Sequence, residues 1–259
     1  MHEILKNLTS DALVLDLGCN EGSFSADATA ARVVRTDRDY LRGRNFVQAD
    51  AAHLPFSDGT FAAIVSNHSL EHFDDLAGAF REIRRIAAPG GALFVAVPDA
   101  STLTDEVYRW LARGGGHVNR FTSASETAGA IESATGLHHV ATRILYSSLS
   151  FLNRRNSPRP APRRLLLLGG GYEWSLFVYA WLSRRLDRWL KTRTSVYGWA
   201  FYFGRVTEPI DTEAWVNVCI RCGSGHAAHV LATRFRAGWN LPGLRAWRCP
   251  ACGAVNPLH

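Results

Sequence analysis

Short apolar runs recur along the first hundred residues, each ending at or beside an acidic or polar residue. They occupy residues 14–17, 32–37, 45–50, 61–65 and 92–98. Between the last two, Leu76, Phe80, Ile83 and Ile86 recur at helical spacing, and Pro89-Gly90-Gly91 is expected to end that helix. Apolar strands that alternate with helices in this way predict βαβ units and a parallel sheet.

The first apolar run leads into a glycine-punctuated turn at residues 18–22, Gly-Cys-Asn-Glu-Gly, which is expected to precede a helix. Such a turn places backbone N–H groups at the carboxyl end of a strand, where open α/β sheets bind ligands. Glycine lets a ligand approach the main chain closely. A dinucleotide site requires G-x-G-x-x-G, and Asn20 replaces its middle glycine, so the turn disfavours a nicotinamide cofactor.

Several motifs in a fixed order carry a resemblance to a known family. They are VLDLGCNEG at 14–22, Asp37, ADAAHLPF at 49–56, SNHSLEHF at 66–73 and the PGG at 89–91. Together they resemble the class I S-adenosylmethionine-dependent methyltransferases, in particular the branch with a Leu-Glu-His element after the fourth strand, over roughly residues 10–145. The resemblance implies a Rossmann-like α/β fold with a seven-stranded sheet flanked by helices, and S-adenosylmethionine as cofactor.

The cofactor's chemistry matches the residues at the predicted strand ends. Asp37 is placed to accept both ribose hydroxyls, and Asp50, with Ala51 beside it, can accept from the adenine amine. Leu54 and Phe56 are apolar candidates to pack against the adenine ring. For either acid alone, a solvated carboxylate at a strand end is an equally good interpretation.

The remaining predicted cofactor residues belong to the turn and to the fourth strand. Gly18, Cys19, Asn20, Gly22 and Asn67 are expected to hold the methionine end. By resemblance, Asp16 orients the turn. Asn20 stands where the family usually has a second glycine, and asparagine tolerates unusual backbone angles better than most residues.

Methyl transfer is an in-line displacement at a sulfonium carbon, so positioning supplies most of the catalysis. An oxygen or carbon acceptor also benefits from a general base, and His72 and His117 are the predicted catalytic residues, with His68 and Glu71 as further candidates. Two other interpretations stay open: a structural or cofactor-contacting histidine, and a divalent ion held by the acid and histidine after the fourth strand, as in some relatives.

Four of the five cysteines form two C-x-x-C-G turns, at residues 219–223 and 249–253. Cys219, Cys222, Cys249 and Cys252 have the spacing of a tetrahedral zinc site, and the segment resembles a zinc ribbon. Four thiolate ligands leave no open position, which predicts a structural Zn²⁺. Disulfides, a redox pair and a rubredoxin-type iron site are the alternatives.

Residues 138–146 and 195–204 are predicted as the sixth and seventh strands, with an insertion between them at about 150–195. From residue 143 to 205, twelve arginines and lysines face two acids, a formal charge of +10 within a chain of +6. Trp174, Trp181 and Trp189 lie beside apolar and basic residues at helical spacing, which predicts an amphipathic helix. A substrate lid, contact with an anionic membrane and contact with nucleic acid are three interpretations of it.

The predicted organisation is a methyltransferase domain at 1–206 that contains the insertion, followed by a zinc-ribbon-like domain at 207–259. The predicted function is methyl transfer to oxygen or carbon of a small-molecule or lipid-linked acceptor. An RNA methyltransferase that uses the insertion and ribbon, and a non-catalytic S-adenosylmethionine-binding protein, are the alternatives. Residues 1–10 show no signal-peptide pattern, and the cysteine usage favours a reducing compartment, so we expect a cytoplasmic protein, with peripheral contact at the inner face of the membrane under the membrane interpretation. The sequence does not predict the oligomeric state.

Overall fold

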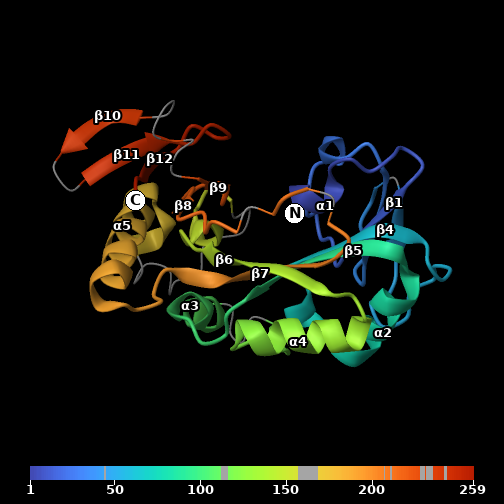
Figure 1. Cartoon of the computed structure of the whole chain (residues 1–259). Helices are drawn as coiled ribbons and strands as arrows, with labels where there is room; N and C mark the ends of the chain where they lie inside the picture. The colour runs from blue at the N-terminus through green and yellow to red at the C-terminus, as the bar shows by residue number, and fades with distance from the viewer. Residues whose placement is uncertain are drawn as a thin grey trace. The chain divides into compact units, whose positions relative to one another are not determined.

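The computed structural model in Figure 1 describes residues 1–43, 45–111, 116–156, 169–206, 208–210, 212–227, 231, 236–241 and 244–259. The chain forms two compact units. The first unit comprises Met1–Pro98, Gly116–Arg143 and Trp199–Thr212, and the second comprises Asp99–Gly115, Ile144–Gly198 and Glu213–His259. The domain boundary between residues 206 and 207 stays a prediction.

A seven-stranded sheet has the order β3-β2-β1-β4-β5-β7-β6. Its strands are β1 (Leu13–Leu17), β2 (Arg32–Asp37), β3 (Phe46–Gln48), β4 (Phe61–Asn67), β5 (Ala87–Pro98), β6 (His139–Tyr146) and β7 (Val196–Gly204). β1 pairs in parallel with both β2 and β4, and β2–β3 and β4–β5 are parallel as well. The Rossmann-like α/β fold predicted from the sequence is confirmed.

The central strands are apolar because both of their faces are covered. Leu15, Ile64 and Leu93 are completely buried in the main core. Helices α2 (Leu76–Ile86) and α4 (Ala124–Thr135) pack beside each other on one face of the sheet in Figure 1. α2 begins where the Asp75 carboxylate accepts the Gly78 N–H, a typical N-cap. The first unit also contains α1 (His2–Leu5) and the 3-10 turn η2 (Leu70–His72).

Two local expectations are wrong. No helix of ordinary length follows the glycine turn. Every residue between β1 and β2 is described, and the only helical element in this segment is the 3-10 turn η1 (Ala26–Ala28). Two glycines at positive φ begin this segment, and Ser23, Ser25, Asp27 and Thr29 alternate with other residues after them; glycine and these short polar side chains both disfavour a helix. In addition, α2 ends at Ile86, before the Pro-Gly-Gly sequence, which lies in β5 where the pairing with β4 shifts register.

The second unit combines helices with two small sheets. Its elements are α3 (Leu103–Leu111), the 3-10 turn η3 (Ser150–Leu152), α5 (Glu173–Leu190), β8 (Asn217–Val218), β9 (Gly225–His226), β10 (Arg236–Leu241), β11 (Leu244–Arg248) and β12 (Val255–Pro257). β8 and β9 form an antiparallel pair, and β10, β11 and β12 form an antiparallel three-stranded sheet. The proline-rich start of the insertion lies outside the described residues. Among the described helices, none combines the length and the apolar character of a membrane span.

The amphipathic helix predicted in the insertion is α5, and its buried side packs within the second unit. Leu176 and Ala180 form a small core with Leu149, Leu152 and Ile220. Because Ile220 belongs to the first C-x-x-C turn, α5 and the cysteine-containing segment share a core instead of forming separate bodies.

Candidate functional site

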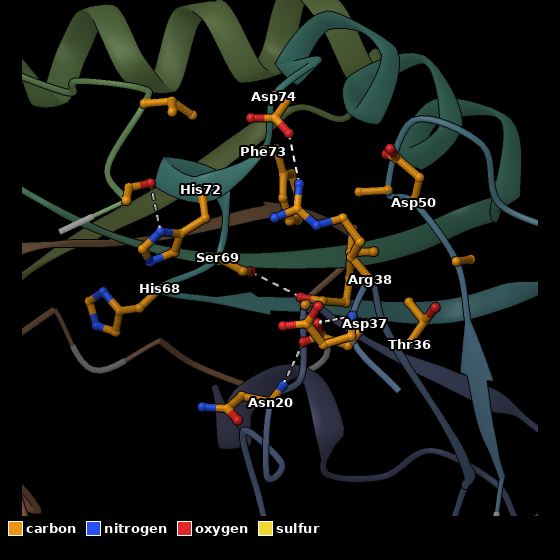
Figure 2. A pocket seen from close by; sticks show the side chains of 17 residues that line it. Asn20, Thr36, Asp37, Arg38, Asp50, His68, Ser69, His72, Phe73 and Asp74 are labelled. Atoms are coloured by element: carbon orange, nitrogen blue, oxygen red, sulfur yellow. Dashed lines mark hydrogen bonds and ion pairs between the residues drawn. The ribbon is translucent and has the colours of Figure 1, made fainter. Parts of the chain in front are cut away.

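A cavity of about 470 Å³ opens in the first unit at the carboxyl ends of β1, β2 and β4 (Figure 2). The turn after β1, the ends of β2 and β3 and the segment around η2 all contribute to its wall. Its lining is Leu17, Gly18, Asn20, Thr36, Asp37, Arg38, Asp39, Ala49, Asp50, Ala51, His68, Ser69, His72, Phe73, Asp74, Gly116 and Val118. The carboxyl edge of a parallel sheet is where α/β folds bind ligands, so this cavity is the candidate active site.

Hydrogen bonds within the protein hold the glycine turn in place. The N–H groups of Gly18 and Cys19 both donate to the Thr36 carbonyl oxygen, at 2.9 and 3.0 Å. A Cβ at Gly18 would lie 2.5 Å from the Ser69 Cβ, and Gly18 has φ +66°. The close contact with Ser69, which immediately precedes η2, therefore requires glycine at this position whether or not a ligand is bound. Asn20 also adopts positive φ, at 43°, as its backbone tolerance allows.

Two carboxylates in the cavity wall are held by backbone donors. The Asp37 carboxylate accepts the N–H of Asn20 at 2.9 Å and that of Asp39 at 3.1 Å. The Asp50 carboxylate accepts the Ala52 N–H at 2.8 Å. An ionised carboxylate has about four acceptor sites, so both keep acceptor capacity for ligand hydroxyl or amino groups. Figure 2 shows Asp37 near Asn20 and Asp50 at another part of the wall.

Four predicted cofactor residues do not line the cavity: Asp16, Cys19, Gly22 and Asn67. Asp16 is fully buried, accepts the Ser23 N–H at 2.9 Å and lies 3.7 Å from the Arg35 guanidinium. Burial raises the pKa of the Asp16 carboxyl. Its second oxygen, Oδ1, is buried with no hydrogen-bond partner among the described residues. Asp16 thus shapes the turn from behind, and the part of the chain that the structure describes leaves one of its acceptor oxygens unused.

The predicted catalytic histidines come from segments far apart in the chain. The Nδ1 atom of His72, in η2, lies 2.9 Å from the carbonyl oxygen of Gly116, a hydrogen bond that fixes the imidazole ring. The His117 ring stands edge-on to that of His72, with centroids 4.9 Å apart. His72 lines the cavity and His117 does not. The structure therefore brings both imidazoles together but exposes one of them to the cavity.

Two imidazoles of this region, those of His72 and His68, have lowered pKa values. Burial lowers the pKa of His72 below its ordinary value, although its hydrogen bond to Gly116 acts in the opposite direction. Burial, together with the neighbouring His117 and His72, lowers the pKa of His68 to about 4. A neutral imidazole can accept a proton, which is what a general base must do.

Glu71 extends this cluster from a buried position. Its side chain is 1% exposed, and one carboxylate oxygen lies 3.8 Å from the Nδ1 atom of His68. One ligand atom from each of Glu71, His72 and His117 lies within 4.8 Å of the other two, close enough to bind a divalent cation. Both chemistries left open by the sequence, a base and a bound ion, therefore remain compatible with this cluster.

Several lining residues were not among the predicted site residues. Ser69 donates its hydroxyl to the Leu17 carbonyl oxygen at 2.9 Å, and Arg38 pairs with Asp74 at 2.7 Å (Figure 2). Phe73 supplies an aromatic surface to the wall. Ser69 and Phe73 lie within the SNHSLEHF motif, which was the available signal, whereas nothing in the sequence marks the Arg38–Asp74 pair.

The apolar residues expected against the adenine ring lie elsewhere. Leu54 belongs to the main core, and Phe56 packs edge-on against Phe61 with ring centroids 5.0 Å apart. Neither lines the cavity. The apolar part of its wall consists instead of Leu17, Ala49, Ala51, Phe73 and Val118.

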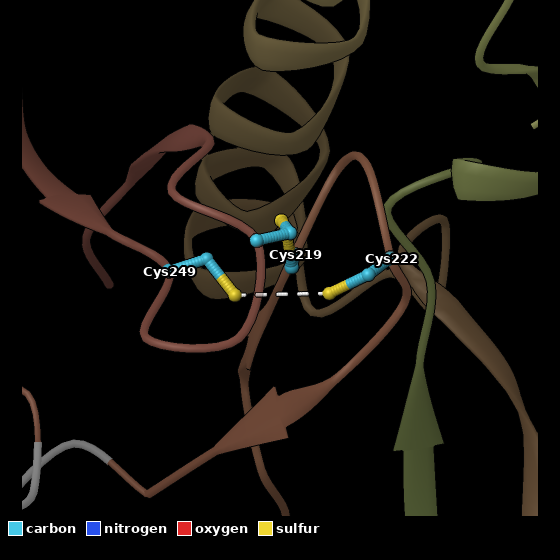
Figure 3. A group of neighbouring side chains, drawn as sticks. Cys219, Cys222 and Cys249 are labelled. Atoms are coloured by element: carbon cyan, nitrogen blue, oxygen red, sulfur yellow. Dashed lines mark hydrogen bonds between the residues drawn. The ribbon is translucent and has the colours of Figure 1, made fainter. Parts of the chain in front are cut away.

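The four cysteines of the two C-x-x-C-G turns meet in the second unit, and Figure 3 shows three of them. Their Sγ atoms lie within 4.8 Å of one another, with Cys219–Cys252 at 3.5 Å and Cys222–Cys249 at 3.7 Å. All are free thiols, so no disulfide links them. Tetrahedral bonds of ~2.3 Å place two thiolates about 3.8 Å apart, so the spacing fits a metal ion.

The two cysteine turns share one hydrogen-bonding pattern. The Gly223 N–H donates to the Cys219 carbonyl at 3.0 Å, and the Gly253 N–H donates to the Cys249 carbonyl at 2.8 Å. Gly223 and Gly253 both have positive φ, 73° and 74°. This repeated geometry is what allows each turn to present two thiols on the same side.

Comparison with known proteins identifies the family. A family model described as a methyltransferase domain matches residues 1–134, more than half of the chain, and the chain belongs to this family. The match includes β1 to β5, α2, the glycine turn, Asp37 and the Leu-Glu-His segment.

Curated relatives match part of the chain. The ubiquinone/menaquinone biosynthesis C-methyltransferase UbiE of Haemophilus ducreyi is 34% identical over 122 residues, which is 37% of this chain and 47% of that protein. A malonyl-[acyl-carrier protein] O-methyltransferase of Pseudescherichia vulneris is 28% identical over 137 residues, 48% of this chain and 55% of that protein. The chain thus spans about half the length of the curated relatives it matches.

Among solved structures, geranyl diphosphate C-methyltransferase from Streptomyces coelicolor has a similar fold. Its TM-score is 0.52 at 15% identity, with 79% of this chain and 76% of that chain covered. At this identity the similarity concerns the fold alone.

Proposed function

We propose that this protein is an S-adenosylmethionine-dependent methyltransferase that acts on oxygen or carbon of a small-molecule or lipid-linked acceptor. The observation that carries the proposal is the pair of backbone-held carboxylates, Asp37 and Asp50, in a cavity at the carboxyl edge of the sheet. The relatives support the acceptor class, since their names describe C-methylation in quinone biosynthesis and O-methylation of a malonyl carrier protein.

The donors and acceptors of the cavity fit this cofactor. Asp37 would accept the ribose hydroxyls, Asp50 the adenine amine, and Phe73 and Leu17 would contact apolar parts of the cofactor. When bound, the cofactor supplies an electrophilic methyl group on a positively charged sulfur. The unused Oδ1 atom of Asp16 is an acceptor that a water or the amino group of the methionine end would satisfy.

His72 is the residue we assign as general base, with His117 orienting its ring. The Gly116 carbonyl accepts from Nδ1–H, which leaves the Nε2 lone pair of neutral His72 as the proton acceptor. The lowered pKa of His72 keeps that atom unprotonated at neutral pH. Nε2 would accept the proton that the acceptor atom loses on methylation.

The four-cysteine cluster is proposed to hold a structural Zn²⁺. Cys219, Cys222, Cys249 and Cys252 supply all four ligands, so the ion has no open position for a substrate. Its contribution would be to the folding of the second unit.

The proposed function is tested first by calorimetry of the full chain with S-adenosylmethionine and S-adenosylhomocysteine. Transfer of a radiolabelled methyl group is then measured with a panel of hydroxylated quinone precursors, carrier-linked acids, prenyl diphosphates and total RNA. Micromolar binding and label in a small or lipid-linked compound are expected. Absence of cofactor binding, or label only in RNA, would overturn the proposal.

The role of His72 is tested with an acceptor found in that panel. His72→Ala is expected to lower turnover by about 10²–10⁴ and to leave cofactor affinity unchanged. His138→Ala is the control, because His138 is largely exposed and pairs only with Glu132 among the described residues. Turnover that disappears with EDTA and returns with Mg²⁺ would instead assign the Glu71–His72–His117 cluster to a bound ion.

A further inference from the structure

We propose that the exposed side of α5 binds the surface of an anionic lipid bilayer. This surface, the α5 stripe, consists of Trp174, Val178, Trp181, Leu182, Arg185 and Trp189. The inference does not depend on the proposed function, because it concerns a surface of the second unit and is tested by binding alone.

The α5 stripe is a continuous face of the helix. At about 100° per residue, its six positions fall within an arc of roughly 100°. Leu176, Ala180 and Ser183, which are buried, lie on the opposite side. Trp174 is 66% exposed and Trp189 is 70% exposed, and Val178 and Leu182 between them are 51% and 46% exposed. A contiguous exposed face of tryptophans and aliphatic residues marks an interaction surface.

Cations accompany the apolar residues of the stripe. The Arg185 guanidinium lies 4.8 Å from the Trp181 ring centroid and 6.0 Å from that of Trp189. Arg188 and Lys191 are exposed at the carboxyl end of the helix. The stripe therefore combines apolar surface with positive charge.

The two acids of α5 are engaged within the second unit. Glu173 accepts from the Arg221 guanidinium at 2.6 and 3.0 Å. Asp187 accepts from the Thr194 N–H at 2.7 Å and from the Ser195 N–H at 2.9 Å. Glu173 is thus paired with an arginine, whereas Asp187 keeps its charge but, at about 100° per residue, lies on the side of the helix away from the stripe.

This combination matches the interface of an anionic bilayer. Tryptophan rings favour the headgroup region, aliphatic residues reach the acyl boundary, and arginine side chains extend to the lipid phosphates. A contact between the stripes of two copies would bring the arginines of both copies into one interface, where like charges repel. Nucleic acid would use the tryptophans for stacking but would leave Val178 and Leu182 against a charged backbone.

The buried side of α5 is firmly held, which makes the stripe a fixed platform. The Arg184 guanidinium is buried and donates to the carbonyl oxygens of Ser195, Ser147 and Val216, at 2.8 to 3.1 Å. Together with the Arg221–Glu173 pair, these bonds join the first turn and the carboxyl-terminal half of the helix to the rest of the second unit. Binding would then require little reordering of the helix.

The proposal is tested by flotation of the full chain with vesicles of phosphatidylcholine alone or with one quarter phosphatidylglycerol. The wild type is expected to float with the anionic vesicles and to be released by high salt. Trp174→Ala/Trp189→Ala and Arg188→Ser/Lys191→Ser are each expected to weaken the partition coefficient at least about tenfold.

Matched controls separate the stripe from general effects. Tyr40→Ala/Val140→Ala removes exposed apolar side chains of the first unit, and Arg81→Ser/Arg84→Ser removes the same charge from α2. Both should float like the wild type. Circular dichroism and thermal unfolding establish that each variant is folded. Three results would overturn the proposal. In the first, the wild type does not float with anionic vesicles. In the second, the control variants lose binding as much as the α5 variants. In the third, the α5 variants lose only dimerisation or RNA binding while vesicle binding is unchanged.

Discussion

The Asp37 carboxylate and the Asn20 backbone N–H lie 2.9 Å apart, joining the end of β2 to the glycine turn after β1. This bond closes one side of the cavity with a residue at positive φ. It also aims the carboxylate, since a second backbone donor, the Asp39 N–H, binds the other oxygen. The site is thus organised by main-chain geometry before any ligand binds.

Replacement of Asp37 tests this arrangement. Asp37→Ala is expected to weaken S-adenosylmethionine binding by about tenfold to a hundredfold, because hydrogen bonds to a charged group contribute ~1.5–3 kcal/mol. Calorimetry with the full chain measures the change. Asp27→Asn, an exposed carboxylate outside the cavity lining, is the control and should bind normally. Unchanged affinity in Asp37→Ala would remove Asp37 from the ribose site.

Gly18 and Gly129 should respond in opposite ways to alanine. Gly18→Ala forces a Cβ to within 2.5 Å of the Ser69 Cβ at positive φ, so a loss of about 1–3 kcal/mol of folding free energy is expected. Gly129 lies inside α4, where an added Cβ would meet no atom of the described residues within 4 Å, and Gly129→Ala should stabilise by about 0.5–1 kcal/mol. Urea unfolding of both variants measures the difference. Equal effects would contradict the assigned role of Ser69 packing.

Replacement of a cysteine of the cluster is expected to reduce zinc binding, whereas replacement of the cysteine outside it is not. Cys249→Ser is expected to lower the bound zinc from one ion per chain and to increase amide exchange in β8, β9, β11 and β12. Cys19→Ser is the matched control, because Cys19 is a free thiol of the first unit. Elemental analysis and hydrogen exchange of reduced protein provide the measurements. Zinc-free wild-type protein with undiminished protection would contradict a structural metal.

His68 should make stability depend on pH. Its pKa is lowered to about 4, so the unfolded chain, with a histidine pKa of ~6.5, binds the proton first as the pH falls. The free energy of unfolding therefore has its full contribution from neutral His68 above pH ~6.5. It decreases as the pH falls toward 4, by about 2 kcal/mol between pH 7 and 5.

Unfolding of His68→Gln measures this effect. The substituted chain should lose that part of the pH dependence, whereas His138→Gln, at an exposed position, should keep it. NMR titration that finds an ordinary His68 pKa would refute the explanation.

Patterns local to the sequence predicted the strands well and their surroundings less well. The buried strands β1, β4 and β5 are recognisable because strands covered on both faces are apolar throughout. The missing helix after the glycine turn was not predicted, since the turn motif is compatible with both outcomes. β5 begins before the Pro-Gly-Gly sequence because pairing with β4 outweighs the local preference of these residues.

The candidate site likewise has a part that local sequence patterns predict and a part that they do not. Asp37 and Asp50 line the cavity because the carboxyl ends of parallel strands meet at one edge, a consequence of βαβ connectivity that the sequence indicates. Asp16 and Asn67 have the same kind of position in the sequence but do not line it. Strand pairing and side-chain direction decide which strand-end residue faces the cavity, and neither is visible in spacing alone.

The sequence by itself determined the family, the order of the motifs that follow the strands, and the spacing of the four cysteines, because each motif consists of residues close together in the chain. Only the tertiary structure decided that His72 meets Gly116, that Gly18 accommodates Ser69, and that α5 shares a core with the first cysteine turn. Those contacts join segments separated by about 40 residues or more, and their formation depends on packing across the whole unit. The glycine turn shows both contributions: its residues mark a ligand site, whereas β2 and η2 give it its shape.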